Sequence, residues 1–242
     1  MRKLLVAVLV LALAGCSPAR TDDRELTVLA AASLTEAFTQ IGKDFEAANA
    51  GAKVTFSFGG SAGLAQQITA GGVPAGVFAA ASPATMKTVT DAGDAAGAPV
   101  VFVKNQLVIA VAKGNPKGLT SPGALTGAGI KVALCAEEVP CGAAAAKALA
   151  GVQITPVTRE PDVKAALAKL KLGEVDAALV YRTDAQAART DVDAVEFPES
   201  AQAINDYPIV ALTGEPLATA FVAYVRSPPA QQVLIAAGFQ KP

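Results

Sequence analysis

Apolar residues along the chain alternate between two spacings, one typical of strands and one typical of helices. Helical spacing is clearest at Leu34, Ala37, Phe38, Ile41 and Phe45. Further helices are predicted to start near residue 61 and to cover 83–92, 142–150, 162–172, 183–188, 216–225 and 228–237. Short apolar, often β-branched runs predict strands at 26–30, 54–58, 77–80, 100–103, 107–111, 131–134, 152–156, 177–181, 192–197 and 209–212.

This alternation is typical of α/β proteins, in which parallel sheets are covered by helices. About ten strands in a chain of 242 residues fit two smaller sheets better than one large sheet. Two polar breaks between strands, Asn105-Gln106 and Asn205-Asp206, are the candidate crossings between the two parts. We therefore expect one lobe from 26–104 with 208–242 and a second from 105–207, with a ligand cleft between them.

The N-terminus has the features of an export signal. Arg2 and Lys3 precede an apolar run of eleven residues, 4–14, which is too short to span a bilayer and suits a signal peptide. Leu13-Ala14-Gly15-Cys16 resembles a bacterial lipobox, which implies a signal peptide at 1–15, lipidation of Cys16 and a tether at 16–25. The alternative is an ordinary signal peptide with a chance cysteine.

Composition excludes several classes of function. The chain is 52% hydrophobic and 17% charged, which is typical of a folded globular protein. It contains no histidine, so it cannot use histidine-activated nucleophiles or imidazole metal ligands. Its net charge of -1 argues against binding nucleic acid.

Cys135 and Cys141 are the two cysteines beyond the export segment. In an oxidising compartment, a pair so close in sequence favours a disulfide. Two buried free thiols and a two-thiolate metal site are the alternatives, and the metal site lacks further soft ligands.

Four predicted helix starts share one property. They are Ser33, with Glu36 three residues on as in a capping box; Gly59-Gly60-Ser61; Val139-Pro140-Cys141-Gly142; and Asp162. Helix N-termini present unpaired N–H groups and a partial positive charge, so they favour anions. Taken singly, each start is ordinary helix capping.

As a set, these segments resemble the molybdate-binding proteins of ABC importers. The resemblance rests on Val28-Leu29-Ala30-Ala31-Ala32-Ser33-Leu34, on 57–68, on Val139-Pro140-Cys141-Gly142, on Pro161-Asp162-Val163 and on 178–185, which contains Val180-Tyr181-Arg182-Thr183-Asp184-Ala185. It implies a two-lobed class II periplasmic-binding fold, with a mixed, mainly parallel sheet in each lobe. One departure is Gly76, where relatives commonly carry aspartate.

The resemblance also implies the site. A tetrahedral oxyanion would be held by hydroxyl and N–H groups of Ser33 and Ser61, the N–H groups of Cys141 and Val163, and the hydroxyl of Tyr181. No metal cation and no cofactor are expected. From the residues alone, Tyr181 could equally be a core aromatic, and Arg159 and Arg182 could either raise the local potential or pair with carboxylates. Glu137 and Glu138 are expected on a loop surface.

The expected function is that of a monomeric, lipid-anchored extracytoplasmic receptor. It would bind molybdate or tungstate and deliver it to an ABC permease with its ATPase. The alternative within this class is a receptor for sulfate or another oxyanion. A serine hydrolase with Lys104, Lys113 or Lys131 as base is disfavoured because no Ser-x-x-Lys pair exists, so no enzyme activity is expected. A ligand-sensing regulator is disfavoured because no DNA-binding segment precedes Leu26.

Overall fold

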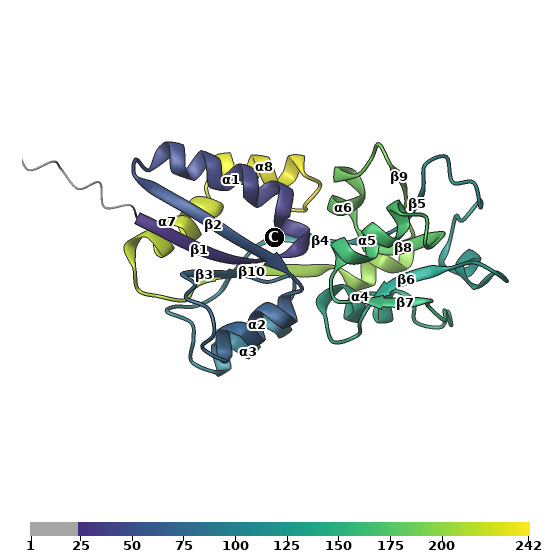
Figure 1. The fold of residues 1–242 in the computed structure, drawn as a ribbon, viewed down its shortest axis with the longest axis horizontal. Helices are drawn as coiled ribbons and strands as arrows, with labels where there is room; N and C mark the ends of the chain where they lie inside the picture. Colours follow the sequence, from purple (N-terminus) through teal and green to yellow (C-terminus); the bar gives the residue numbers. More distant parts are fainter. Residues whose placement is uncertain (1–23) are drawn as a thin grey trace, which may run out of the picture.

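The computed structural model describes residues 24–242, so the signal segment, Cys16 and most of the tether lie outside the described residues. Two five-stranded sheets lie side by side along the long axis of the molecule (Figure 1). We call the parts built on them the first and the second lobe. Within residues 24–242, none of the helices combines the length and the hydrophobicity that crossing a membrane requires.

The first sheet has the order β2 (Ala52–Gly59), β1 (Arg24–Ala31), β3 (Val77–Ala79), β10 (Asn205–Ala211) and β4 (Val100–Asn105). Only β10 runs against the other four strands. Leu26, Val28 and Ala30 of β1 pack on one face, while Leu29 packs on the other, as the two-residue period of a strand requires. The first face is covered by α1 (Thr35–Ala48), α7 (Pro216–Val225) and α8 (Pro228–Ala236), and the second by α2 (Ser61–Thr69) and α3 (Pro83–Asp91).

The second sheet has the order β7 (Thr158–Glu160), β6 (Val132–Cys135), β8 (Ala177–Tyr181), β5 (Leu107–Ala112) and β9 (Val192–Val195), and here only β5 runs against the others. All residues of β6 and β8 are buried, as in strands covered on both faces. The covering helices are α4 (Pro140–Ala148) on one side and α5 (Val163–Lys171) and α6 (Arg182–Ala187) on the other (Figure 1). The predicted α/β architecture of two mixed, mainly parallel sheets is confirmed.

The chain crosses between the lobes after Asn105 and before Asn205, and these two residues face each other at the ends of β4 and β10. The predicted strand at 209–212 was too short, because β10 begins at Asn205, four residues earlier. Asn205 and Asp206 are thus paired strand residues rather than a loop.

The predicted strand at 152–156 is wrong. The segment does alternate in burial, but it has no sheet partner. Pairing with β6 begins only at Thr158, after Pro156, a residue that has no N–H to donate. Alternation therefore indicated an extended segment correctly but misplaced the strand.

Candidate anion-binding site

A pocket lies between the lobes at the carboxyl ends of their parallel strands. Its cavity volume is about 20 Å³, far less than a drug-sized ligand needs. The first lobe contributes Ala31, Ala32, Ser33, Gly59, Gly60, Ser61 and Ala81, and the second Val139, Pro140, Cys141, Asp162, Val163 and Tyr181. Ser33, Ser61, Cys141, Val163 and Tyr181, which the sequence predicts as site residues, therefore all line one pocket.

Three helices begin at this pocket. Ser61 is the first residue of α2, Val163 is the first of α5, and Cys141 follows Pro140 in the first turn of α4. N–H groups in a first turn have no partner within their helix, so they are available to a ligand. Each helix also brings the positive end of its dipole to the pocket.

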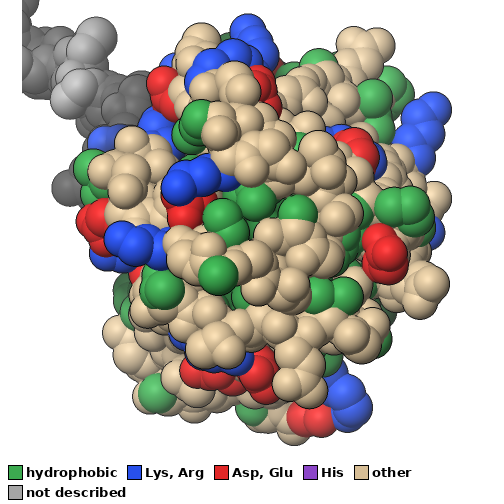
Figure 2. All heavy atoms as spheres, turned by 90° about the vertical axis from the view of Figure 1, so that its right-hand side faces the viewer, with side chains coloured by type: hydrophobic (Ala, Val, Ile, Leu, Met, Phe, Trp, Pro, Cys, Tyr) green, Lys and Arg blue, Asp and Glu red, His purple; other side chains and the backbone are tan. Residues whose placement is uncertain are grey.

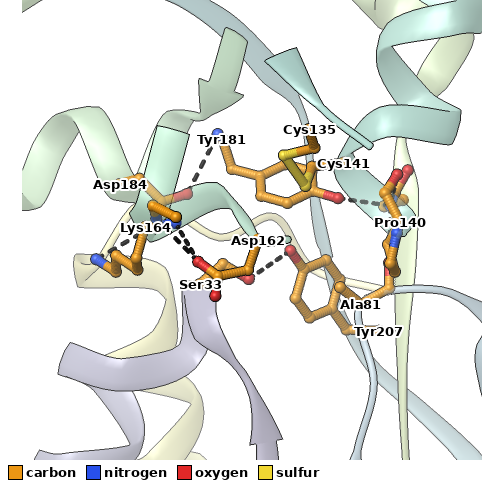
Figure 3. The surroundings of a disulfide bond; sticks show 12 residues. Ser33, Ala81, Cys135, Pro140, Cys141, Asp162, Lys164, Tyr181, Asp184 and Tyr207 are labelled. Carbon is orange, nitrogen blue, oxygen red and sulfur yellow. Dashed lines mark hydrogen bonds and ion pairs between the residues drawn. A yellow bond between two sulfur atoms is a disulfide. The ribbon is translucent and has the colours of Figure 1, made fainter. Parts of the chain in front are cut away.

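Hydroxyl groups complete the lining (Figure 3). Ser33 Oγ lies 2.8 Å from the hydroxyl of Tyr207, a residue of β10 buried behind the pocket. Ser61 Oγ accepts the N–H of Ala81 at 3.0 Å, and Tyr181 Oη accepts the side-chain amide of Asn205 at 2.8 Å. Burial raises the pKa of both tyrosine hydroxyls, so Tyr181 and Tyr207 stay protonated and can donate.

No lysine or arginine lines the pocket among the described residues. The one acidic residue that lines it is Asp162. Its carboxylate caps α5, accepting the N–H groups of Lys164 and Ala165 at 2.8 and 3.0 Å. The predicted N-cap at Asp162 is confirmed. Arg159 pairs with Glu137 and Arg182 with Glu196, so both arginines are bound to carboxylates rather than facing the pocket.

The pocket wall at α4 is held by a short covalent loop. Cys135, the last residue of β6, is joined to Cys141 by a disulfide with a Cα–Cα distance of 5.7 Å. Both cysteines are buried, and Figure 3 shows the bridge with its surroundings. Residues 24–242 contain no group of three or more acidic or cysteine side chains able to hold a metal ion.

An ion-pair cluster ties the lobes together beside the pocket. Lys164 Nζ of α5 lies 2.7 and 2.8 Å from the carboxylate oxygens of Glu36 in α1, across the lobe boundary. It also lies 3.2 Å from Asp184, which is fully buried and accepts the N–H of Tyr181. Burial raises the pKa of Asp184 to about 6, against the opposing charge of Lys164.

We expect Asp184 to make stability fall as pH rises from about 4 to 6. Its pKa is 3.8 in the unfolded chain and about 6 in the fold, so the unfolded state ionises first over this range, and ionisation lowers the free energy of the unfolded state relative to the fold. The loss approaches about 3 kcal/mol and is complete above pH 6. Denaturant titrations at several pH values should show it in the wild type but not in Asp184→Asn, which mimics the protonated acid. Asp91→Asn, at an exposed carboxylate of α3 that pairs with Lys87 outside this cluster, is the control. A wild-type-to-Asp184→Asn difference that does not vary with pH would contradict this prediction.

Two local predictions at the first helix starts are wrong. Ser33 is not the N-cap of α1, because it lies in a short 3-10 helix, Ala32–Leu34, and Leu34 precedes α1 without a side-chain cap. Its hydroxyl turns to Tyr207 instead, and Glu36 turns to Lys164. Both partners are distant in sequence, so local spacing could not reveal them.

Gly60, at the pocket, and Gly76, away from it, both lie where protein atoms leave no room for a side chain. A Cβ on Gly60 would lie 2.3 Å from the carbonyl oxygen of Pro161, in the opposite lobe. At Gly76, just before β3, a Cβ would lie 2.5 Å from Leu26 Cδ1, so any side chain would require Leu26 to shift.

Comparison with known proteins agrees with this geometry. The family model described as bacterial extracellular solute-binding protein matches residues 26–240. Molybdate-binding protein ModA of Mycobacterium tuberculosis is 43% identical over 253 residues, covering 99% of this chain and 97% of that protein. The resemblance inferred from the sequence motifs is confirmed by this relative.

Solved structures agree on the fold. The periplasmic molybdate-binding protein of Azotobacter vinelandii has a TM-score of 0.76 at 21% identity, covering 90% of this chain and 99% of that one. The sulfate-binding protein SubI of Mycobacterium tuberculosis has a TM-score of 0.78 at 19% identity, covering 90% and 87%. At these identities they support the two-lobed periplasmic-binding architecture and nothing finer. The chain belongs to the family of bacterial extracellular solute-binding proteins, and it is a receptor rather than an enzyme.

Proposed function

We propose that this chain is an extracytoplasmic receptor that binds molybdate, and tungstate in the same way, between its lobes and delivers it to an ABC import permease. The observation that carries the proposal is the pocket itself. It is lined from both lobes by residues that can offer neutral N–H and O–H donors: Ser33, Ser61, Cys141, Val163 and Tyr181. Among the described residues, no lysine or arginine lines it. The ligand named for the 43% identical relative fits this chemistry.

A fully deprotonated dianion matches such a site because it offers only acceptors. Each hydrogen bond to a charged partner contributes about 1.5–3 kcal/mol, much of it offset by desolvation. Several such bonds give a net affinity in the micromolar to nanomolar range, about -8 to -12 kcal/mol. Closing the lobes over the ion would create the surface that the permease recognises.

Several further features belong to the proposal. Cys16 carries a lipid anchor, with 16–25 as the tether to the membrane, and the receptor works as a monomer. The Cys135–Cys141 bridge, formed in the oxidising compartment, holds the α4 wall of the pocket in place. The lobes, divided after Asn105 and before Asn205 rather than at 104 and 208, close about the two crossings. Nucleic acid is not a partner in this proposal. On the end face of the second lobe, positive and negative side chains are interspersed (Figure 2).

Titration calorimetry with molybdate, tungstate, sulfate and phosphate tests the function. We expect molybdate and tungstate to bind most tightly, and Ser33→Ala and Ser61→Ala each to weaken them by about 1–3 kcal/mol through loss of one hydroxyl donor. Ser121→Ala, which removes a cap hydrogen bond outside the pocket, should leave binding unchanged. Sulfate binding without molybdate binding would favour the sulfate receptor. Wild-type molybdate affinity in both Ser33→Ala and Ser61→Ala would show that the anion binds elsewhere.

A further inference from the structure

Two hydroxyls of the pocket, those of Ser61 and Tyr181, accept hydrogen bonds from other groups of the protein. A hydroxyl has one proton to give and can accept hydrogen bonds from other groups. Ser61 Oγ accepts the N–H of Ala81, and Tyr181 Oη accepts the amide of Asn205. Where a protein donor fills the accepting position, the hydroxyl's own proton is free to point into the pocket.

Asn205 can only act as a donor here. The Nδ2 that lies 2.8 Å from Tyr181 Oη also lies 2.7 Å from the carbonyl oxygen of Ala81, a group that only accepts. The amide nitrogen rather than its oxygen must therefore face both partners. A third carbonyl, that of Pro140, lies 3.5 Å from the same nitrogen and favours the same orientation.

The position of Asn205 lets one side chain act on both lobes. It is the first residue of β10, where the chain returns from the second lobe to the first. Its amide joins Tyr181 at the end of β8 to the carbonyl oxygen of Ala81 after β3, and the N–H of the same residue donates to Ser61. Asn205 thus contacts one pocket hydroxyl directly and a second through one intervening residue, Ala81.

We propose that Asn205 is a specificity-determining residue: by donating to Tyr181 it directs the tyrosine's only proton into the pocket, and the site therefore rejects oxyanions that carry a proton. The inference rests on the proposed oxyanion receptor. A protonated anion such as hydrogen phosphate needs an acceptor for its O–H group. With the Tyr181 proton directed inward, that O–H faces another O–H, and one of the two stays unpaired.

Sulfate and phosphate form a matched pair of probes, because they are similar in size and differ near neutral pH in carrying a proton. In Asn205→Asp the carboxylate accepts the Tyr181 proton, so the tyrosine oxygen presents a lone pair to the pocket. In Asn205→Leu the side chain has a similar volume and no polar atoms. Both anions are measured in competition with molybdate, and thermal unfolding checks that each variant is folded.

We expect wild type to favour sulfate over phosphate, and Asn205→Asp to move the phosphate-to-sulfate affinity ratio at least about tenfold toward phosphate. Asn205→Leu should weaken both anions and change this ratio less than about threefold, since it provides neither donor nor acceptor. Equal ratios in the two variants, or a folded Asn205→Asp that binds neither anion, would overturn the assignment. A wild-type protein that binds no deprotonated oxyanion would instead overturn the proposed function.

Discussion

Gly60→Ala is expected to weaken oxyanion binding about a hundredfold or more while the protein still folds. The added Cβ would lie 2.3 Å from the carbonyl oxygen of Pro161, which is backbone of the opposite lobe and cannot rotate away. The lobes must therefore separate at the pocket, and the N–H of Val163 moves away from Ser61. In the proposed site these groups bind the same ion, so a displacement of about 1 Å would remove several hydrogen bonds at once.

Folding should survive because Gly60 has φ -61° and ψ 124°, angles that alanine adopts freely. The N-cap of α2 loses at most about 1 kcal/mol, since alanine is a poorer cap than glycine. Gly63→Ala is the matched control: it lies one turn along α2, nothing is within 4 Å of its Cβ, and it gains helix propensity. Calorimetry measures the molybdate affinities. A Gly60→Ala affinity within about threefold of wild type would show that binding does not require the close approach of Gly60 to Pro161.

Gly142→Ala is expected to destabilise the fold by about 3 kcal/mol or more. Its Cβ would lie 1.8 Å from the carbonyl oxygen of Ala136 and 2.9 Å from that of Cys135, so α4 would have to move as a unit. Overpacking in well-packed regions costs about 1–3 kcal/mol, and here the colliding atoms are backbone. The disulfide between Cys135 and Cys141 spans the same contact and limits relaxation.

Denaturant unfolding measures this loss, and binding should fall with it because Cys141 lies in the first turn of α4. Gly214→Ala is the control, with nothing within 4 Å of its Cβ and no positive φ. If the free energy of unfolding of Gly142→Ala were within about 0.5 kcal/mol of wild type, the loop at 135–141 would be able to shift and accommodate the added methyl group.

Local pattern was a good guide wherever burial on one face or both faces of an element selects the residues. The helix at Thr35–Ala48 follows from Ala37, Phe38, Ile41 and Phe45, which are all buried. The strand expected at 152–156 is wrong because strand formation needs a partner as well as alternation, and the chain meets β6 only from Val157 onward.

In the candidate site, too, local sequence features were predicted and contacts between distant residues were not. Motif resemblance selected five residues that share one pocket, because each lies at a helix start or a strand end that the sequence marks locally. Tyr207, Lys164 and the contact of Gly60 with Pro161 were missed. Their partners lie far away in the sequence, and no local spacing encodes such a meeting.

By itself, the sequence determined the alternation of strands and helices, the two-part organisation and the places where unpaired N–H groups occur, since these depend on periodicity and on capping chemistry close in the chain. Only the tertiary structure decided which hydroxyl faces which donor, where the lobes touch and that Asn205 joins them. Those relations depend on how two separately built sheets meet. Hydrogen bonds and close contacts act over a few ångströms, whatever the separation of the residues in the chain.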